Sequence, residues 1–194
     1  MQTQTVMLCG VGGQGTILAA DLLARAALAA GFEVKVSEIH GMAQRGGAVT
    51  TVVRFGDDVR SMVADPGCAD CIVSFETTEA LRNQAFLKEG GYLLVSSETI
   101  KPLPVACGRA SMPHDAKGAL ARAGAVLIES KALAEREGNA KCENVVLLGA
   151  LEARLGFGTE LWKAVIEDRV PPKTVEANLR AFDLGLEFAS GALA

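Results

Sequence analysis

The chain begins with short apolar runs on either side of a longer helical pattern. Residues 5–9 (TVMLC) form an apolar run that ends in glycines, which predicts a buried strand. Residues 16–30 carry a helical apolar face, with Asp21 and Arg25 four positions apart on its polar side. Residues 33–39 predict a second strand. Together these elements predict a β-α-β unit with parallel strands and a right-handed crossover.

The middle of the chain predicts a hairpin followed by more α/β elements. Residues 48–55 and 59–63 flank Gly56-Asp57-Asp58, a pattern typical of a β-hairpin, so we expect a mixed sheet. The next predicted elements are a strand at 71–75, a helix from about 78 to 87 that Gly90-Gly91 ends, and a strand at 92–96. A helix near 115–123 and a strand at 125–128 follow.

The last third of the chain predicts helices at 144–155, 160–168 and 173–189. Thr159 is a candidate cap for the second of these helices. In the third, apolar side chains recur on one face, at Val175, Leu179, Phe182 and Leu186. We therefore expect one domain over residues 1–194. Its expected fold class is α/β, with a Rossmann-like, mixed, largely parallel sheet, flanking helices, one β-hairpin insertion and a C-terminal helical layer.

Composition narrows the classes of function. The 194 residues are 49% hydrophobic and only 5% aromatic, and their net charge is −4. A mildly acidic chain with few aromatic rings lacks the electrostatic footprint and the stacking surface of a nucleic-acid binder. Five cysteines, with no secretory signal at the start, predict reduced thiols and a cytoplasmic protein. The mean hydropathy of +0.26 favours either a well-buried core or a subunit with apolar faces covered by partners.

A glycine-rich turn, Gly10-Val11-Gly12-Gly13-Gln14-Gly15, follows the first predicted strand and precedes the first predicted helix. This is the context of the dinucleotide-binding fingerprint, in which the helix N-terminus offers free N–H groups to a phosphate. Its usual companion is an acid at the end of the second strand, and Glu38 lies near that place. The turn therefore predicts phosphate or nucleotide binding, and the alternative is a glycine turn that serves packing only.

A second glycine-rich segment, SEIHGMAQRGG at residues 37–47, follows the second predicted strand. Its candidate binding residues are Gln44, Arg45, Gly46 and Gly47, which can present backbone N–H groups and one guanidinium to an anion. The alternative for Arg45 is a solvated surface arginine. His40 has no visible catalytic partner, so a structural role is favoured.

The remaining polar motifs favour structural readings. Cys68 and Cys71 form a C-x-x-C, but Cys71 enters a predicted strand and no second C-x-x-C completes a metal site, so we expect structural thiols and no metal. Glu76 and Glu79 follow a strand end and suit the first turn of a helix. Asn144 opens a helical run and is predicted to cap it.

Taken together, the motifs at 10–15 and 37–47 resemble the gamma-type subunit of 2-oxoacid:ferredoxin oxidoreductases. Within that family the chain is most similar to the small (beta) subunit of the indolepyruvate branch, because the other branches differ from the segment at 37–47. The resemblance continues at 69–70, 75–82, 144–150 and 178–185. It covers nearly the whole chain and is weakest at 103–138.

The resemblance implies a role in a heteromeric enzyme. Such enzymes decarboxylate a 2-oxoacid, here an aryl-pyruvate such as indolepyruvate, on thiamine diphosphate, pass electrons through iron–sulfur clusters to ferredoxin and release an acyl-CoA. A large partner subunit is implied to hold the thiamine diphosphate, its magnesium ion and the clusters. This chain has no spaced set of four cysteines for a cluster. It is therefore expected to hold no cofactor alone, to be inactive alone and to contact CoA through the two glycine-rich segments.

Two alternatives remain at this point. One is a free-standing oxidoreductase that binds NAD or a flavin through the first glycine turn. The other is a purely structural interaction subunit, in which both glycine-rich segments only pack.

Overall fold

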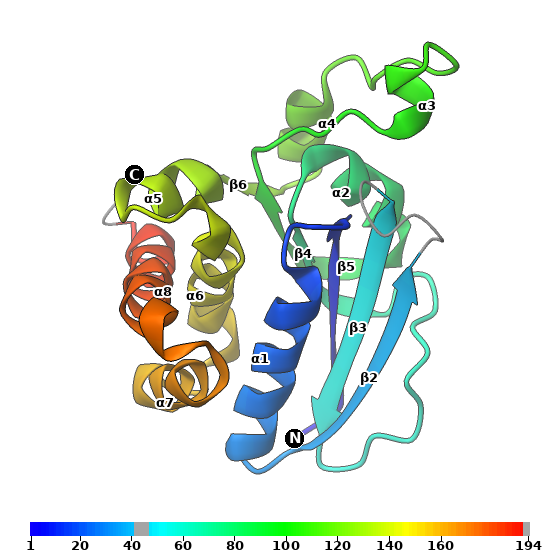
Figure 1. Cartoon of the computed structure of the whole chain (residues 1–194). Coiled ribbons are helices and arrows are strands. Elements are labelled where there is room, and N and C mark those ends of the chain that lie inside the picture. Colours follow the sequence, from blue (N-terminus) through cyan, green and yellow to red (C-terminus); the bar gives the residue numbers. More distant parts are fainter. Residues whose placement is uncertain (41–46, 192–194) are drawn as a thin grey trace.

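The computed structural model describes residues 1–40 and 47–191, and these form a central sheet between two helical layers (Figure 1). The strands of this part lie in the order β2-β3-β1-β4-β5-β6. Their bounds are β1 (Gln4–Val11), β2 (Glu33–His40), β3 (Ala48–Gly56), β4 (Ala69–Ser74), β5 (Leu87–Ser96) and β6 (Val126–Ile128).

The α-helices of the described residues are α1 (Thr16–Ala29), α2 (Thr77–Asn83), α3 (Leu103–Ala106), α4 (Ala116–Arg122), α5 (Ser130–Arg136), α6 (Glu143–Leu155), α7 (Thr159–Arg169) and α8 (Val175–Ala189). Three short 3₁₀ helices, η1 (Gln84–Phe86), η2 (Ala140–Cys142) and η3 (Pro172–Thr174), join neighbouring elements. The three helices predicted for the last third are confirmed as α6, α7 and α8.

The sheet is mixed and mostly parallel. β1 pairs in parallel with β4, β4 with β5 and β5 with β6, whereas β3 runs antiparallel to both of its neighbours, β1 and β2. β2 therefore points the same way as β1 but is separated from it by β3. The predicted fold class is confirmed, although the first two strands do not pair with each other as a simple β-α-β unit would suggest.

The predicted hairpin between residues 48–55 and 59–63 is wrong, because the hairpin partner of β3 is β2. Both edges of β3 are already hydrogen-bonded to β1 and β2, so no edge remains for residues 59–63. Side chains satisfy the backbone of that segment instead. The Val59 N–H donates to Glu33 Oε2 (3.1 Å), and the Arg54 guanidinium donates to the Ser61 and Val63 carbonyls (3.0 and 3.1 Å).

Side chains that alternate along the strands pack into two hydrophobic cores, one on each face of the sheet. Val6 and Leu8 of β1 pack under the layer of α1, α6, α7 and α8, whereas Met7 and Cys9 face the layer of α2 and α4 (Figure 1). Burying both faces gives parallel strands the continuous apolar runs seen in the sequence. The Asp21–Arg25 pair expected on α1 is confirmed, with 3.0 Å between Oδ1 and Nε.

Two expected element boundaries are wrong. α2 ends at Asn83 and β5 already begins at Leu87, so Gly90 and Gly91 lie inside a strand, next to a register shift in its pairing with β4. Thr159 does not cap α7: Gly158 occupies the cap position with φ of 103°, and no side chain caps the helix.

Candidate functional site

The candidate site lies where the helices of two adjacent strands leave on opposite faces of the sheet. β1 leads into α1 on one face, and its parallel neighbour β4 leads into α2 on the other (Figure 1). Such a switch of direction marks the position, at the carboxyl ends of the two strands, where open α/β sheets bind ligands. This position, here called the crevice, lies between the glycine turn at 10–15 and residues 75–77.

The geometry of the turn explains its glycines. A Cβ on Gly10 would lie 2.9 Å from Phe75 Cβ, so glycine lets β1 approach the end of β4. Gly13 and Gly15 have φ of 106° and 77°, a region that side chains other than glycine rarely adopt. Among residues 1–40 and 47–191, no atom outside its chain neighbours lies within 4 Å of a Cβ built on Gly13, so the positive φ rather than crowding favours glycine there.

The structure brings the two glycine-rich segments together. The Gly12 N–H donates to the Gly47 carbonyl at 2.9 Å, which joins the turn after β1 to the residue before β3. Gly10, Gly12, Gly13, Gln14, Gly15 and Gly47 therefore share one end of the sheet. Gln44, Arg45 and Gly46 lie outside the described residues. His40 is the last residue of β2 and pairs with Val49.

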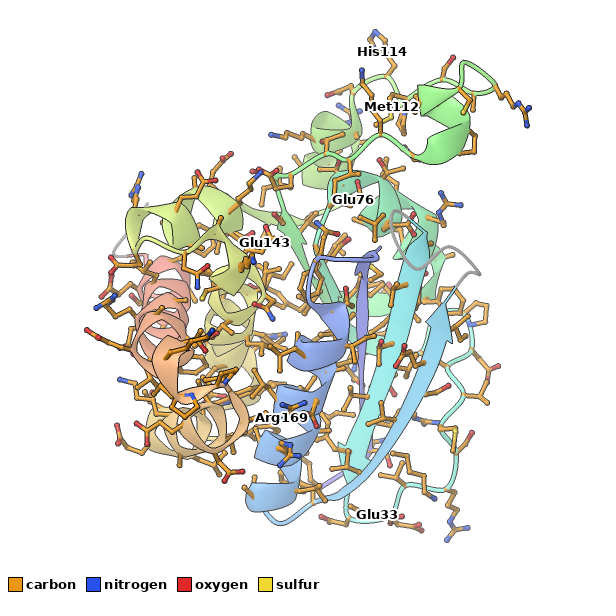
Figure 2. The ribbon with its side chains drawn as sticks, viewed as in Figure 1. Glu33, Glu76, Met112, His114, Glu143 and Arg169 are labelled. Atoms are coloured by element: carbon orange, nitrogen blue, oxygen red, sulfur yellow. The ribbon has the colours of Figure 1, made fainter. Side chains whose placement is uncertain are left out.

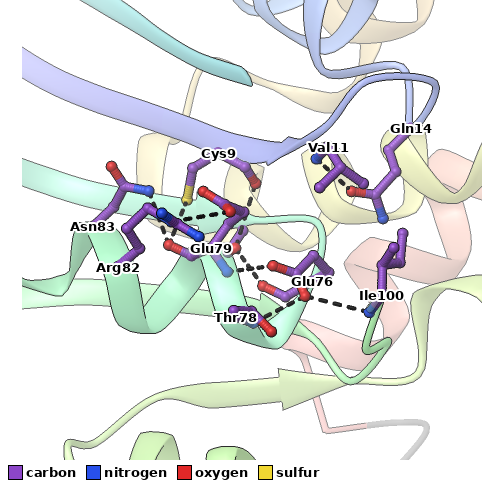
Figure 3. A network of polar contacts seen from close by, with 10 residues as sticks. Cys9, Val11, Gln14, Glu76, Thr78, Glu79, Arg82, Asn83 and Ile100 are labelled. Carbon is purple, nitrogen blue, oxygen red and sulfur yellow. Dashed lines mark hydrogen bonds and ion pairs between the residues drawn. The ribbon is translucent and has the colours of Figure 1, made fainter. Parts of the chain in front are cut away.

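Gln14 is committed to the protein framework. Its Oε1 accepts a hydrogen bond from the Val11 N–H at 2.9 Å (Figure 3). Its Nε2 donates to the Phe75 carbonyl at 2.8 Å. The side chain thus ties the turn after β1 to the turn after β4. Gln14 fixes the shape of the crevice with both ends of its amide.

The N-terminus of α1 faces this crevice without a side-chain cap. Gly15 occupies the cap position, and the Thr16 hydroxyl oxygen is buried with no hydrogen-bond partner among the described residues. Unpaired N–H groups in the first turn carry a partial positive charge that favours an anion. The arrangement can therefore hold a negatively charged group.

Asn144 was not anticipated as part of this site. The predicted cap role is wrong, because Cys142 is the cap residue of α6 and Asn144 is its second helical residue. The Asn144 Nδ2 instead donates to the Gly15 carbonyl at 3.3 Å, and a Cβ on Gly15 would lie 2.8 Å from that nitrogen. Its Oδ1 is buried and has no hydrogen-bond partner in the described part of the chain. An asparagine at the start of an apolar helix was the signal available in the sequence.

Buried carboxylates surround the other side of the crevice. Glu76 caps α2 and accepts from the N–H groups of Thr78 (2.9 Å), Glu79 and Ile100 (3.4 Å) (Figure 3). Burial raises the pKa of Glu79, the Arg82 guanidinium 3.1 Å away opposes the shift, and the Glu76 charge adds to it. The first-turn role is confirmed for Glu79, whereas Glu76 lies one position earlier as the cap residue of α2 and also anchors the chain after β5 through Ile100.

Glu143, the first residue of α6, lies at the same end of the molecule as Glu76 (Figure 2). Burial raises the pKa of the Glu143 carboxyl to about 7, and the neighbouring carboxylates of Glu98 and Glu135 add to the shift while Lys131 opposes it. This carboxyl is therefore a group that can gain or lose a proton near neutral pH beside the crevice.

Glu38 does not occupy the place of a ribose-binding acid. Because β3 lies between β1 and β2, Glu38 stands two strand spacings, or about 10 Å, from the β1 axis. In the dinucleotide-binding arrangement the acid ends the strand next to β1. The strand order thus argues against the NAD or flavin alternative.

The comparisons with known proteins decide the family. The family model described as "Pyruvate ferredoxin/flavodoxin oxidoreductase" matches residues 5–188. The chain belongs to this family. An indolepyruvate oxidoreductase subunit IorB of Pyrococcus horikoshii is 44% identical over 97% of both chains. The resemblance stated from the two glycine-rich motifs is therefore confirmed.

Solved structures of the oxidoreductase family share the fold. The gamma subunit of a keto/oxoacid ferredoxin oxidoreductase from Geobacter sulfurreducens is 27% identical, with a TM-score of 0.73 over 97% of this chain and 99% of the other. The 2-oxoglutarate:ferredoxin oxidoreductase of Magnetococcus marinus, solved with 2-oxoglutarate, coenzyme A and succinyl-CoA bound, is 22% identical. Its TM-score is 0.76, and the match covers all of this chain and 32% of that one. The chain is thus a small subunit of a heteromeric 2-oxoacid oxidoreductase.

The cysteines of this oxidoreductase subunit are all unpaired. Cys71 lies in β4, where burial raises the pKa of its thiol to about 11, and Cys9 is fully buried with a pKa raised to about 12. Within residues 1–40 and 47–191, no group of three or more His, Cys, Asp or Glu side chains is arranged to hold a metal ion. No helix in the same ranges has the length and apolar character needed to cross a bilayer.

Proposed function

We propose that this chain is the small subunit of an oxidoreductase that acts on indolepyruvate or a related aryl-pyruvate. The relative of Pyrococcus horikoshii, 44% identical over 97% of both chains, carries that substrate in its name and supports the assignment. In the proposed reaction the assembled enzyme decarboxylates the 2-oxoacid oxidatively, passes the electrons to ferredoxin and releases an acyl-CoA. The isolated chain is inactive.

The larger subunit holds thiamine diphosphate, magnesium and the iron–sulfur clusters in this proposal. The described residues of this chain do not fit an iron–sulfur cluster, because no group of three or more His, Cys, Asp or Glu side chains among them is arranged to hold a metal ion, whereas a cluster needs a set of converging cysteine thiolates. Unpaired cysteines also fit the reducing conditions of a cytoplasm, where we expect the enzyme to work.

The contribution of this chain is an anion site at the switch between β1 and β4. The uncapped N-terminus of α1 offers N–H donors, and the Gly12–Gly47 hydrogen bond joins the turn after β1 to the last residue of the second glycine-rich segment. Arg45 adds a guanidinium, which pairs with phosphate through two parallel hydrogen bonds. We assign this site to a phosphate of CoA, and the coenzyme A bound in the Magnetococcus marinus enzyme supports the choice.

The site binds and orients but takes no direct part in bond making. The N–H groups at the start of α1 and the Arg45 charge hold the anionic end of the coenzyme at the subunit boundary. Contacts of this kind to a remote part of a substrate position its reacting end at the active centre, which the partner carries. The single observation that carries the assignment is the meeting of the two glycine-rich segments at the uncapped helix.

The test is Arg45→Ala in the enzyme assembled from both subunits, with Arg60→Ala as the matched control. Arg60 is exposed, and its ion-pair partner among the described residues is Asp58 (2.8 Å), in the connection after β3. We expect the KM for CoA to rise about tenfold or more in Arg45→Ala, because a charge-assisted contact is worth about 1.5–3 kcal/mol. The KM for the 2-oxoacid should stay unchanged. Unaltered CoA kinetics in a fully assembled enzyme would leave the segment a packing role, as in a purely structural subunit.

A further inference from the structure

Residues 101–122, here called the arm, project from the body of the subunit beyond α2. Figure 1 shows α3 at the far end of this excursion, and Figure 2 shows Met112 and His114 standing away from the sheet. Among the arm side chains that the structure describes, only Leu120 on α4 is buried. The arm therefore has no core of its own and adds almost nothing to the core of the domain.

Local hydrogen bonds nevertheless define its shape. The N–H groups of Arg109 and Ala110 both donate to the Pro104 carbonyl (2.8 and 3.2 Å), which closes the turn after α3. Asp115 caps α4 through the Gly118 N–H (3.0 Å) and pairs with Arg122 (3.1 Å). Its φ of 111° is the one positive value at a non-glycine position in the described residues, a conformation that side chains other than glycine rarely adopt. A strained segment with Leu120 as its one buried side chain among the described residues gains little from the core of this chain, so its stabilising contacts are expected outside it.

The charge of the arm is opposite to that of the subunit. Lys101, Arg109, Lys117 and Arg122 stand against a single acid, Asp115, in a chain whose net charge is −4. Arg122 is paired with that acid, and the other three cations are exposed and form no ion pair with a described residue. The arm thus presents a basic surface that the chain does not neutralise.

We propose that the arm is the docking surface for an acidic surface of the larger subunit. A groove of about 410 Å³ between the start of the arm and the beginning of α4 is lined by the two exposed lysines Lys101 and Lys117 and by the aliphatic side chains of Met112 and Pro113. Asp115 also lines it, but its carboxylate is paired with Arg122. A carboxylate side chain of the partner fits this combination of charge and aliphatic surface. The arm follows the carboxyl end of β5, so the partner approaches the same end of the sheet as the two glycine-rich segments.

Two other occupants fit the arm less well. A duplex nucleic acid would be repelled by a subunit whose net charge is −4, and a single strand would find no Phe, Tyr or Trp in residues 101–122 on which to stack its bases. A contact of arm against arm between two copies of this chain would bring two basic surfaces together, and like charges would repel. The family is heteromeric, so an acidic partner subunit is the occupant that the charges favour.

The decisive experiment is a titration of the purified larger subunit into this chain at low and at high NaCl. The test variant is Arg109→Glu/Lys117→Glu, and the matched control is Arg60→Glu/Lys173→Glu, which makes the same charge change at exposed positions outside the arm. We expect the test variant to bind about tenfold or more weakly and to lose most of the salt dependence, since charge pairs at an interface weaken with ionic strength. The control should bind as the wild type does.

Equal weakening in both variants, or none in either, would overturn the assignment. All three proteins should unfold at the same temperature, because none of the four substituted side chains is buried. As a second measurement, trypsin should cut after Arg109 in the isolated chain, and the larger subunit should protect that bond. Cleavage at the same rate in the complex would also refute the proposal. So would an arm-dependent homodimer or arm-dependent retention of nucleic acid by the isolated chain.

These outcomes are independent of the proposed anion site. The arm variants alter assembly at any CoA concentration, whereas Arg45→Ala alters the KM for CoA in an enzyme that is already assembled. Failure of one test therefore leaves the other proposal standing.

Discussion

Glu152 holds the connection between α6 and α7, and its removal gives a sharp test of how buried polar groups stabilise this fold. The side chain is 4% exposed. Its carboxylate accepts three hydrogen bonds, from Trp162 Nε1 (2.6 Å), the Gly158 N–H (2.6 Å) and the Phe157 N–H (3.2 Å). Trp162 is completely buried. In Glu152→Ala, three donors lose their acceptor at once.

The expected loss follows from those contacts. A buried donor left without a partner costs about 1–3 kcal/mol, and water entering the space of the lost side chain recovers part of that cost. We therefore expect Glu152→Ala to lower the free energy of unfolding by about 3–5 kcal/mol, a large share of the 5–15 kcal/mol of a typical domain. Glu152→Gln keeps one acceptor oxygen but turns an amide N–H₂ toward donors, so its loss should be intermediate.

Urea unfolding followed by tryptophan fluorescence measures this directly, because Trp162 is the sole tryptophan of the chain. The control is Glu167→Ala, which removes an exposed carboxylate from α7 and should cost at most about 0.5 kcal/mol. A loss in Glu152→Ala no larger than in the control, with an unchanged urea slope, would refute the argument that these three hydrogen bonds hold the connection.

Three further predictions concern other buried groups. The pKa of Glu143 is raised from 4.5 to about 7, so the native state holds a proton that the unfolded state has lost, and the free energy of unfolding falls as pH rises between these two values. Glu143→Gln should flatten that fall in urea midpoints measured from pH 4 to pH 8. An identical fall in the variant would contradict the assignment. A thiol reagent should label Cys107 and Cys68 quickly in the native protein, and the other three thiols only after unfolding, because those three are buried. Intact-mass measurement counts the labelled cysteines, and early labelling of a third cysteine would contradict the burial pattern. Gly149→Ala should lower the melting temperature, because the added methyl group would overlap the Phe182 carbonyl oxygen on α8. Overpacking of this kind costs about 1–3 kcal/mol. An unchanged melting temperature would mean that α8 moves aside freely.

Local patterns predicted most of the elements. The apolar positions Val175, Leu179, Phe182 and Leu186 recur at helical spacing, and α8 contains all four. The run before the first glycine turn likewise marks β1, because a strand buried on both faces is apolar at every position. These signals depend on neighbours a few residues apart, so one sequence suffices to read them.

Non-local pairing could not be read in the same way. The sequence around residues 48–56 does not indicate that β3 inserts between β1 and β2, because the position of a strand depends on which strand edges are free in the assembled sheet. The Asn144 amide reaches the Gly15 carbonyl across 129 residues of sequence, so a local rule assigned it to its own helix. For the candidate site, the sequence identified the two glycine-rich segments. It missed the side chains of Thr16 and Asn144, which lie at the N-terminus of α1.

The hairpin position of β3 has a consequence for how this family diversifies. β2 and β3 pair over their full lengths, from Glu33 with Gly56 to His40 with Val49, and β3 is also held along β1. The β2–β3 ladder thus fixes both ends of the segment between these strands, and the β1–β3 ladder holds β3 a second time. Insertions or exchanges between the two strands would leave both ladder registers intact, so the length and composition of that segment can change while the sheet stays constant.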